Sequence, residues 1–419
     1  MFVSALLLVT LSFVLWTSNQ KKILRIGVYA GSSWDVPNSR ENRVLDNIIH
    51  QFEKSHSNVK VVYESGIPKK DYDNWLAEKI LKGEQADVFM VPENDFSMLA
   101  SSGAFKSLDS LISKEEAATY YPVAYQAGQY QGHSYALPIE SNPVMMCVNK
   151  DLLEKEGISI PDSNWTLEDL YAICQKVTKD TDGDGLIDQY GITDYTWKQA
   201  LVAYNGHLRN QNGVNIDSVE MHQALSFISK LDSLNQRYKV TSNDFDEGKV
   251  AFYPMSLAQY RTYKPYPYHV AKYSRFSWTC IPMPAAKAGI PATQVKTSLF
   301  AMSSKTKQDK LAWEFMKLLC QNHKNQQELF AKSQGTSVLT SVVKSSQTKK
   351  ILQADDFGLD SLTSQRLDHM MKHSVLDISR DLDYHSLERL DYLLGNALKN
   401  NEIDSILPSI QREMEETGK

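Results

Sequence analysis

The sequence predicts an α/β fold, and two observations support that prediction. In the first hundred residues, short apolar or alternating segments (23–30, 59–63 and 86–91) are separated by longer segments with apolar residues at helical spacing (40–55 and 71–81). Strands that alternate with helices in this way are typical of a parallel, doubly wound sheet. The chain also has 419 residues, which is enough for two or three domains with sizeable cores.

The two expected helices each present one apolar stripe. The stripes are Val44, Leu45, Ile48, Ile49 and Phe52 in the first helix, and Tyr72, Trp75, Leu76 and Ile80 in the second. In a doubly wound sheet, ligands bind beyond the carboxyl ends of the strands. The loop with Trp34, Asp35 and Asn38 follows the first strand, and Glu93 and Asn94 follow the third. These loops are therefore expected at the ligand-binding edge of the sheet.

The stretch from Gly132 to Gly157 organises the rest of the chain. It contains an extended segment at 135–139 and a continuous apolar run at 144–148, which is expected to be a buried strand. Between the two strands lie Glu140, Ser141 and Asn142, followed by Pro143. A polar cluster between rigid elements is well placed to serve as a hinge and as a ligand contact.

Further elements are expected after residue 150. Thr166 and Asp169 form a capping-box pattern at the start of a helix. The expected helices are 151–156, the segment with Leu170, Cys174 and Val177, then 197–204, 221–234 and 307–320, and a tail helix with the stripe Leu387, Leu390, Leu394 and Ala397.

The central stretch resembles the carbohydrate-binding branch of the extracellular solute-binding proteins of ABC importers, the branch that includes maltose-binding protein. The matching pattern is a glycine, Tyr-Ala-Leu-Pro, a carboxylate, and an apolar strand that ends in Asn-Lys-Asp-Leu. The segment Phe245-Asp-Glu-Gly-Lys-Val-Ala251 also resembles a family motif, although Ser256 and Ala258 stand where relatives often have Gly and Trp. The resemblance extends over residues 23–414.

The resemblance implies a two-lobed, periplasmic-binding-protein-like fold with a ligand cleft. Three crossovers are expected, near 137–142, 276–284 and 334–339. One lobe would take residues 23–138 plus 283–335, and the other 139–282 plus 336–419. The implied function is to bind an extracellular solute, most simply a sugar or oligosaccharide, and to deliver it to an ABC permease; a non-sugar solute is the alternative on this scaffold. We expect a monomer that binds no nucleic acid.

The resemblance also implies a set of ligand contacts. Sugars have apolar C–H faces and many hydroxyls, so their sites need aromatic rings together with carboxylate and amide acceptors. The residues of suitable type at matching positions are Trp34, Glu93, Asn94, Glu140, Asn142, Trp197, Tyr260, Tyr384 and His385. The alternative for each is ordinary use in the core or on the surface.

The segment from Asp180 to Asp188 has a calcium-loop pattern. Asp180, Asp182, Asp184 and Asp188 occupy positions 1, 3, 5 and 9 of an EF-hand-like loop, with glycine at position 6. The acidic residue usual at position 12 is absent, because Gly191 stands there. A weak structural calcium site is one hypothesis, and a solvated acidic turn is the other. No cofactor is expected to be required.

The composition narrows the function and location. A net charge of −5 gives no support to nucleic-acid binding. Residues 2–16 are apolar apart from Ser and Thr, so residues 1–22 are expected to be a signal peptide or a membrane anchor of an exported protein. Four cysteines without Cys-x-x-Cys spacing favour buried thiols over metal binding, although an exported protein can pair them.

An enzyme is the alternative from another class. Glu93 and Glu140 are both carboxylates, as a glycosidase pair must be. However, the sequence lacks Gly-x-Ser-x-Gly, His-Glu-x-x-His and the phosphate loop of an ATPase. We therefore expect a binding protein that is not an enzyme.

Overall fold

The computed structural model describes residues 21–34, 41–64, 66–236, 238–263, 276–355, 361–400 and 402–417 of the 419-residue chain. The expected alternation of strands and helices is confirmed at the start of this part: β1 (Lys22–Gly27), α2 (Glu41–Ser55), β2 (Val59–Tyr63), α3 (Lys69–Leu81) and β3 (Val88–Val91). β1 pairs in parallel with both β2 and β3. Residues 1–20 of the leader expected at 1–22, and the loop positions Asp35 and Asn38, lie outside the described residues.

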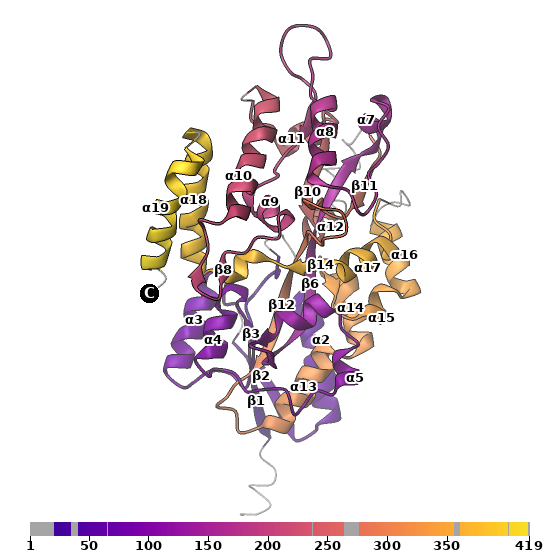
Figure 1. Ribbon diagram of the computed structural model, residues 1–419. Helices are drawn as coiled ribbons and strands as arrows, with labels where there is room; N and C mark the ends of the chain where they lie inside the picture. The colour runs from indigo at the N-terminus through magenta and orange to yellow at the C-terminus, as the bar shows by residue number, and fades with distance from the viewer. Residues whose placement is uncertain are drawn as a thin grey trace, which may run out of the picture.

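The long strand β6 (Ala136–Asn149) connects the two halves of the molecule (Figure 1). The strand order is β2-β1-β3-β12-β6-β10-β7, with β12 at Thr293–Met302, β10 at Val250–Ser256 and β7 at Tyr190–Ile192. The first half of β6 pairs with β12 and with β13 (Thr336–Ser337), and the second half pairs with β10 and with β11 (Trp278–Ile281). β14 (Ser374–Leu376) pairs with β12.

The expectation of two strands interrupted at residues 140–142 is wrong. β6 is one strand of 14 residues, and Glu140, Ser141 and Asn142 lie within it. Its backbone stays extended there because it is paired on both sides. Ser141 lies opposite Thr297 of β12 on one side and Thr336 of β13 on the other. The register shifts once, between Ser298 and Leu299, close to Pro138.

The helices expected later in the chain are present with small shifts of their ends. They are α7 (Lys150–Lys155), α8 (Leu167–Val177), α9 (Trp197–Ala203), α10 (Val219–Asp232), α13 (Asp309–Cys320) and α18 (Tyr384–Asn400). The capping box of α8 is confirmed: the Asp169 N–H donates to Thr166 Oγ1 at 3.2 Å, and the Thr166 N–H donates to Asp169 Oδ2 at 2.8 Å.

The remaining elements complete the described part. The helices are α4 (Phe96–Ser101), α5 (Lys114–Ala117), α6 (Pro122–Ala127), α11 (Ser242–Asp246), α12 (Leu257–Tyr263), α14 (His323–Lys332), α15 (Thr340–Val343), α16 (Ser346–Asp355), α17 (Ser364–Lys372) and α19 (Ile403–Thr417). The 3₁₀ helices are η1 (Glu93–Asp95), η2 (Ser233–Asn235) and η3 (Ile378–Asp381). Two small hairpins are β4 (Gln129–Tyr130) with β5 (His133–Ser134), and β8 (Arg209–Asn210) with β9 (Gly213–Val214).

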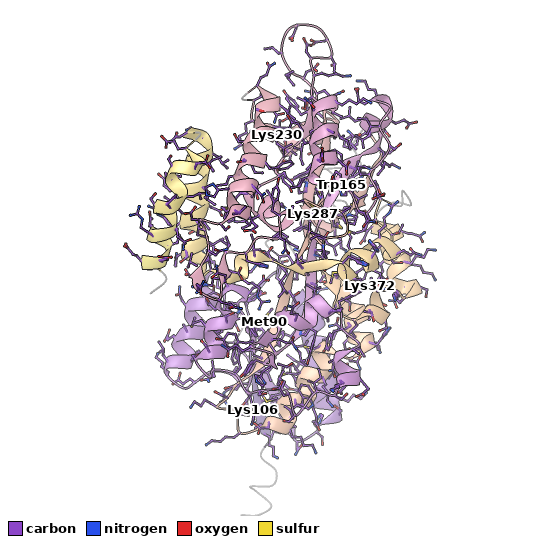
Figure 2. The ribbon with its side chains drawn as sticks, in the orientation of Figure 1. Met90, Lys106, Trp165, Lys230, Lys287 and Lys372 are labelled. Carbon is purple, nitrogen blue, oxygen red and sulfur yellow. The ribbon has the colours of Figure 1, made fainter. Side chains whose placement is uncertain are left out.

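Three groups of buried apolar side chains form the core. The first lies among β1, β2, β3, α2 and α13 and includes Met90; the second lies among α8, α9, α10, α18 and α19 and includes Trp165. Figure 2 shows Met90 and Trp165 in opposite halves of the molecule. The third joins α6 to β11 and to helices α15 and α17. Among the described residues, no helix combines the length and the apolar composition needed to cross a membrane.

Candidate functional site

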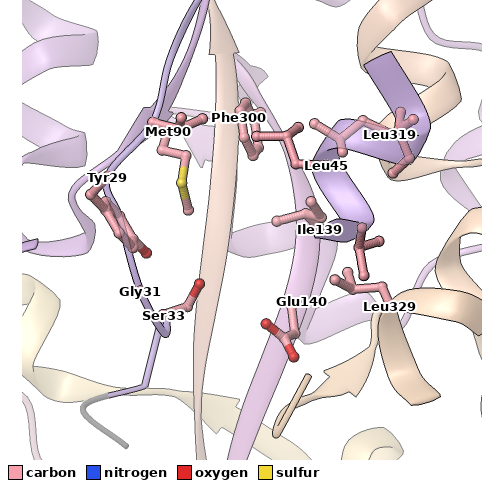
Figure 3. A pocket seen from close by; sticks show the side chains of 13 residues that line it. Tyr29, Gly31, Ser33, Leu45, Met90, Ile139, Glu140, Phe300, Leu319 and Leu329 are labelled. Atoms are coloured by element: carbon pink, nitrogen blue, oxygen red, sulfur yellow. The ribbon is translucent and has the colours of Figure 1, made fainter. Parts of the chain in front are cut away.

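A cavity of about 70 Å³ opens beyond the carboxyl ends of β1 and β3 (Figure 3). Tyr29 and Met90 border one side of it, and Leu319 and Leu329 border the other. Among the described residues that line it, Glu140 carries the only charge. The cavity therefore occupies the edge of the sheet at which a doubly wound fold binds ligands.

The Glu140 carboxylate is almost fully buried, with 3% of the residue exposed. Its Oε1 atom accepts hydrogen bonds from Ser333 Oγ and from the Gly335 N–H, the latter at 2.8 Å. Burial raises the pKa of Glu140 to about 7, against the opposing effects of these hydrogen bonds and of the nearby Arg261 charge. Glu140 thus joins the first expected crossover to the third.

Arg261, at the end of α12, connects this pair of crossovers to the other half of the molecule. Its Nη1 donates to the carbonyls of Phe330 (2.8 Å) and Gly335 (2.9 Å), and its Nε donates to Asp355 Oδ2 at 3.1 Å. The residue is only 4% exposed, and the guanidinium lies 4.7 Å from the centre of the Phe330 ring. A buried, hydrogen-bonded cation therefore lies beside Glu140.

Trp34 lies next to the same carboxylate. Its indole N–H is close enough to Glu140 to help lower the pKa of that group. The indole nitrogen is buried, however, and no described residue accepts a hydrogen bond of ordinary geometry from it. Buried donors are normally paired. An indole N–H beside a carboxylate is suited to a ligand hydroxyl, which can accept from one group and donate to the other.

A second set of charged groups surrounds Glu93, which lies in η1 and is partly buried. Burial raises the pKa of Glu93 to about 7; the charge of Lys296 opposes this shift and that of Asp377 adds to it. The Thr297 N–H also donates to Glu93, and Thr297 lies opposite Ser141 in the sheet. Glu93 is therefore one strand away from the polar segment of β6, and Asn94 lies beside it in η1.

Asn142 has a structural role. Its Oδ1 accepts from the Ala258 N–H at 2.9 Å, at the start of α12. The residue is 6% exposed. Because this bond satisfies a backbone donor of the first helical turn, Asn142 fixes the point at which β10 ends and α12 begins.

Two of the expected aromatic contacts are buried in the core. Trp197 lies in the second core group, and its indole N–H donates to Asp391 Oδ1 at 2.7 Å. Tyr260 is 1% exposed and packs against Trp278 with a ring distance of 5.5 Å. In this conformation neither ring presents a face on which a sugar could stack.

The last two expected contacts are at the surface. Tyr384 is 56% exposed, and its hydroxyl donates to Glu388 Oε1 at 2.6 Å. The His385 ring is also exposed and lies 5.6 Å from the Tyr384 ring. Of the nine expected residues, Trp34 and Glu140 adjoin one another, and Glu93 and Asn94 lie on the neighbouring element.

Three charged residues near the site were missed by the sequence reasoning: Arg261, Lys296 and Arg380. Arg261 and Lys296 reach Glu140 and Glu93 respectively from separate strands and helices. Arg380 of η3 donates to the Ala127 carbonyl at 3.2 Å and lies over the Phe96 ring at 5.6 Å. No spacing in the sequence marks them, because each approaches the site from a distant part of the chain.

The acidic loop projects from the end of the molecule beyond α8 (Figure 1). Carboxylate oxygens of Asp180, Asp182 and Asp188 lie within 4.8 Å of one another, while Asp184 is not part of this group. Asp180 accepts from the Gly183 N–H (2.6 Å) and the Gly185 N–H (2.7 Å), and these backbone bonds lower the pKa of Asp180. The three carboxylates supply the hard oxygen donors that calcium prefers.

Comparison with known proteins assigns the chain to a family. Residues 47–355 match the family model of the bacterial extracellular solute-binding proteins, which is more than half of the chain. The chain belongs to this family. Extracellular solute-binding proteins are exported, so the expectation of export is confirmed. Members of this family bind substrates for ABC importers, as the resemblance implied.

Two curated relatives match at 25% identity. One is the maltotriose-binding protein of Pyrococcus abyssi, matched over 138 residues, or 33% of this chain. The other is described as a binding protein of Brucella abortus, matched over 261 residues, or 59% of this chain. The alignments cover 30% and 61% of the lengths of these relatives.

Solved structures of low sequence identity share the fold. The sugar-binding protein MalE of Xanthomonas citri is 15% identical with a TM-score of 0.76, and the match covers 94% of this chain and 97% of that one. An ABC substrate-binding protein of Listeria monocytogenes, in complex with cycloalternan, is 19% identical with a TM-score of 0.65, over 95% and 99%. These matches confirm the expected two-lobed α/β fold.

Proposed function

We propose that this protein binds a sugar or oligosaccharide between its lobes and delivers it to the permease of an ABC importer. The observation that carries the proposal is the pairing of Trp34 with Glu140 beyond the ends of the parallel strands. The Trp34 ring is only 8% exposed, so its contribution is the indole N–H, which together with the carboxylate can bind a sugar hydroxyl. Among similar proteins, one is named a maltotriose-binding protein and another was solved with cycloalternan.

The charged groups around Glu93 extend this site along the sheet. Glu93 can accept hydrogen bonds from hydroxyls, and Lys296 can donate to them. The two are close enough for the Lys296 charge to affect the pKa of Glu93. Lys296 lies directly opposite Asn142 in the sheet. An oligosaccharide that begins at Trp34 and Glu140 would meet these groups with its next sugar units.

Closure would occur around β6, because this strand contributes to the sheets of both lobes. Hinges of this kind need only a few residues that absorb the change in backbone angles. The shift of register at Ser298 and Leu299, beside Pro138, is a local irregularity at which such bending can be concentrated.

The experiment that tests the substrate class is a thermal-shift screen of the mature protein against a glycan library, with linear and cyclic α-glucans as the first probes. A ligand that binds only the folded state raises the melting temperature. We expect a saturable rise with at least one glycan, and its loss in Trp34→Ala. If no glycan raises the melting temperature but an amino acid or a peptide does, the substrate is a non-sugar solute.

We further propose that binding occurs without turnover, by a monomer without affinity for nucleic acid. The known family role is binding, and a net charge of −5 opposes contact with phosphate backbones. Overnight incubation with the glycan identified by the screen should yield no new reducing ends. Release of shorter glycans, abolished by Glu140→Gln, would instead establish a glycan-degrading enzyme.

Two further measurements test the oligomeric state and the anchoring. Size-exclusion chromatography with light scattering gives the mass of the protein in solution, which should be that of a monomer. Mass spectrometry of the exported protein shows whether residues 1–22 are retained as an anchor.

A further inference from the structure

Two cysteines from distant parts of the chain lie directly opposite each other. Cys147 is in β6 and Cys280 is in β11, and the antiparallel register pairs them residue to residue. Their Sγ atoms are 3.6 Å apart, and both residues are fully buried in the third core group. The other two cysteines lie elsewhere: Cys174 in the second core group and Cys320 in the first.

The backbone hydrogen bonds nearby show whether Cys147 and Cys280 form a hydrogen-bonded or a non-hydrogen-bonded pair of the antiparallel ladder. The Cys280 N–H donates to the Ser361 carbonyl at 2.9 Å, away from β6. Lys150 and Ser277 face each other three positions further along the ladder, and there the Lys150 N–H donates to the Ser277 carbonyl at 2.8 Å, so that pair is hydrogen-bonded. Hydrogen-bonded and non-hydrogen-bonded pairs alternate along antiparallel strands, so Cys147 and Cys280 form a non-hydrogen-bonded pair.

Non-hydrogen-bonded pairs bring opposing residues closest, with about 4.5 Å between their Cα atoms. That separation lies at the short end of the range for disulfide bonds, about 4.4–6.8 Å. Rotation about the Cα–Cβ bonds could therefore bring the sulfurs from 3.6 Å to the bonding distance of about 2.05 Å without moving the strands.

We propose that Cys147 and Cys280 form a disulfide bond when the protein is exported. An exported protein meets an oxidising environment, in which disulfides form and persist. In the reaction, one thiolate attacks the disulfide of a small disulfide oxidant such as oxidised glutathione, which releases one thiol of the oxidant and leaves a mixed disulfide. The second cysteine displaces the other half of the oxidant. Each cysteine loses one hydrogen, one S–S bond forms, and the oxidant is reduced to two thiols.

Because both sulfurs are buried, the bond would form while the core is still open and would then resist reduction. The bond would join β11, which lies within the second expected crossover, to β6, the strand that carries the first. The closed loop from Cys147 to Cys280 holds most of the second lobe, including α8, α9 and α10. A cross-link over so long a loop stabilises the fold mainly by restricting the unfolded chain.

The test is mass spectrometry of the exported protein. The protein is denatured and alkylated without reductant, digested, and searched for linked peptides. We expect Cys147 and Cys280 in one linked pair, lighter by two hydrogens than the two reduced peptides, and alkylated Cys174 and Cys320. The matched control is the double variant Cys174→Ser/Cys320→Ser, which should keep the link, whereas Cys147→Ser should lose it.

A second measurement compares the melting temperatures of the oxidised and reduced wild-type protein, the latter refolded in reductant. The oxidised form should melt about 5 °C or more above the reduced form. The double control variant should show the same difference. Alkylation of all four cysteines in the exported protein, or a link between any other two of them, would overturn the proposal. Equal melting temperatures for linked and reduced protein would overturn its stabilising role.

Discussion

Glu140 and Gly335 are in direct contact across two crossovers. The Gly335 N–H donates to Glu140 Oε1 at 2.8 Å, and a Cβ atom at position 335 would lie 2.5 Å from the same oxygen. The absence of a side chain at position 335 thus allows a buried carboxylate to reach the backbone of the third crossover. The polar segment of β6 is held from both sides, by β12 and by this crossover.

The first prediction concerns this contact. Gly335→Ala should destabilise the protein by about 1–3 kcal/mol, because the new methyl group would displace the Glu140 carboxylate in a well-packed site. Ligand affinity should fall as well, since Glu140 would move relative to Trp34. The measurements are urea unfolding and calorimetric titration with the glycan identified by the screen.

The matched control for this variant is Gly395→Ala. Gly395 is exposed in α18, and a Cβ atom there would meet nothing within 4 Å. Because alanine favours the helix, this change should stabilise the protein by about 0.5–1 kcal/mol without changing affinity. A Gly335→Ala protein as stable as wild type would show that Glu140 relaxes without cost.

The second prediction concerns pH. Burial raises the pKa of Glu140 from 4.5 to about 7 in the folded protein. A carboxyl with a raised folded pKa holds its proton more tightly in the folded state than in the unfolded state. Its contribution to stability is therefore fully present below about pH 4.5 and is lost as the pH rises through 7.

The contribution lost across this window is at most about 3 kcal/mol for Glu140. Glu140→Gln should remove that part of the pH dependence when unfolding is measured from pH 4 to pH 8. Glu93→Gln should remove a similar part, because burial also raises the pKa of Glu93 to about 7. Glu416→Gln, an exposed change on α19, serves as the control. A Glu140→Gln profile that runs parallel to wild type would contradict the assigned cause.

The third prediction separates the ring of Trp34 from its N–H group. Trp34→Phe removes a buried donor that has no acceptor of ordinary geometry in the described structure, so ligand-free stability should be unchanged or slightly higher. Affinity for the glycan should fall by about 0.5–1.5 kcal/mol, because the hydrogen bond to a ligand hydroxyl is lost. Trp34→Ala should cost about 1–3 kcal/mol of affinity, since the packing beside Glu140 is lost too, and it should also lower stability because the ring is only 8% exposed.

The contrast with Trp197 checks the location of the site. Trp197→Ala should cost about 3–5 kcal/mol of stability, because the ring is buried and its N–H is bonded to Asp391. The sequence alone led us to expect a ligand contact at Trp197. Equal affinities for wild type and both Trp34 variants, measured by calorimetry, would place the ligand elsewhere.

The fourth prediction concerns calcium. We propose that the loop with Asp180, Asp182 and Asp188 binds a calcium ion weakly, with a dissociation constant of about 10⁻⁴ M. At about 1 mM calcium, such binding would stabilise the fold by about 1.4 kcal/mol. The melting temperature should therefore rise with calcium and fall with chelator, with little change in glycan affinity, since the loop lies at the far end of the molecule.

Two single variants sharpen the calcium test. Asp182→Ala should abolish the response, whereas Asp184→Ala should retain most of it, because Asp184 lies outside the carboxylate group. The acidic-turn alternative holds if chelator leaves the wild-type melting curve unchanged. A response that survives in both variants and in Asp188→Ala would place the ion elsewhere.

The sequence by itself determined the family fold and the elements that build it. Apolar periodicity located β2 at Val59–Tyr63 and placed α2 within one residue of its observed start. The capping box at Thr166 and Asp169 located the start of α8. Such features depend on residues close together in the chain, so local patterns are sufficient to predict them. The motif around Glu140 likewise marked the centre of the molecule.

Only the tertiary structure decided what the polar residues of that centre contact. Asn142 and Glu140 were expected in a gap between strands, but pairing with β12 and β13 keeps the backbone extended through both. The burial of Trp197 and Tyr260, the approach of Arg261 and Lys296, and the pairing of Cys147 with Cys280 all join segments that are far apart in sequence. Residue type and spacing carry no record of such contacts, because burial and charge are set by whichever distant segments the packed fold brings alongside.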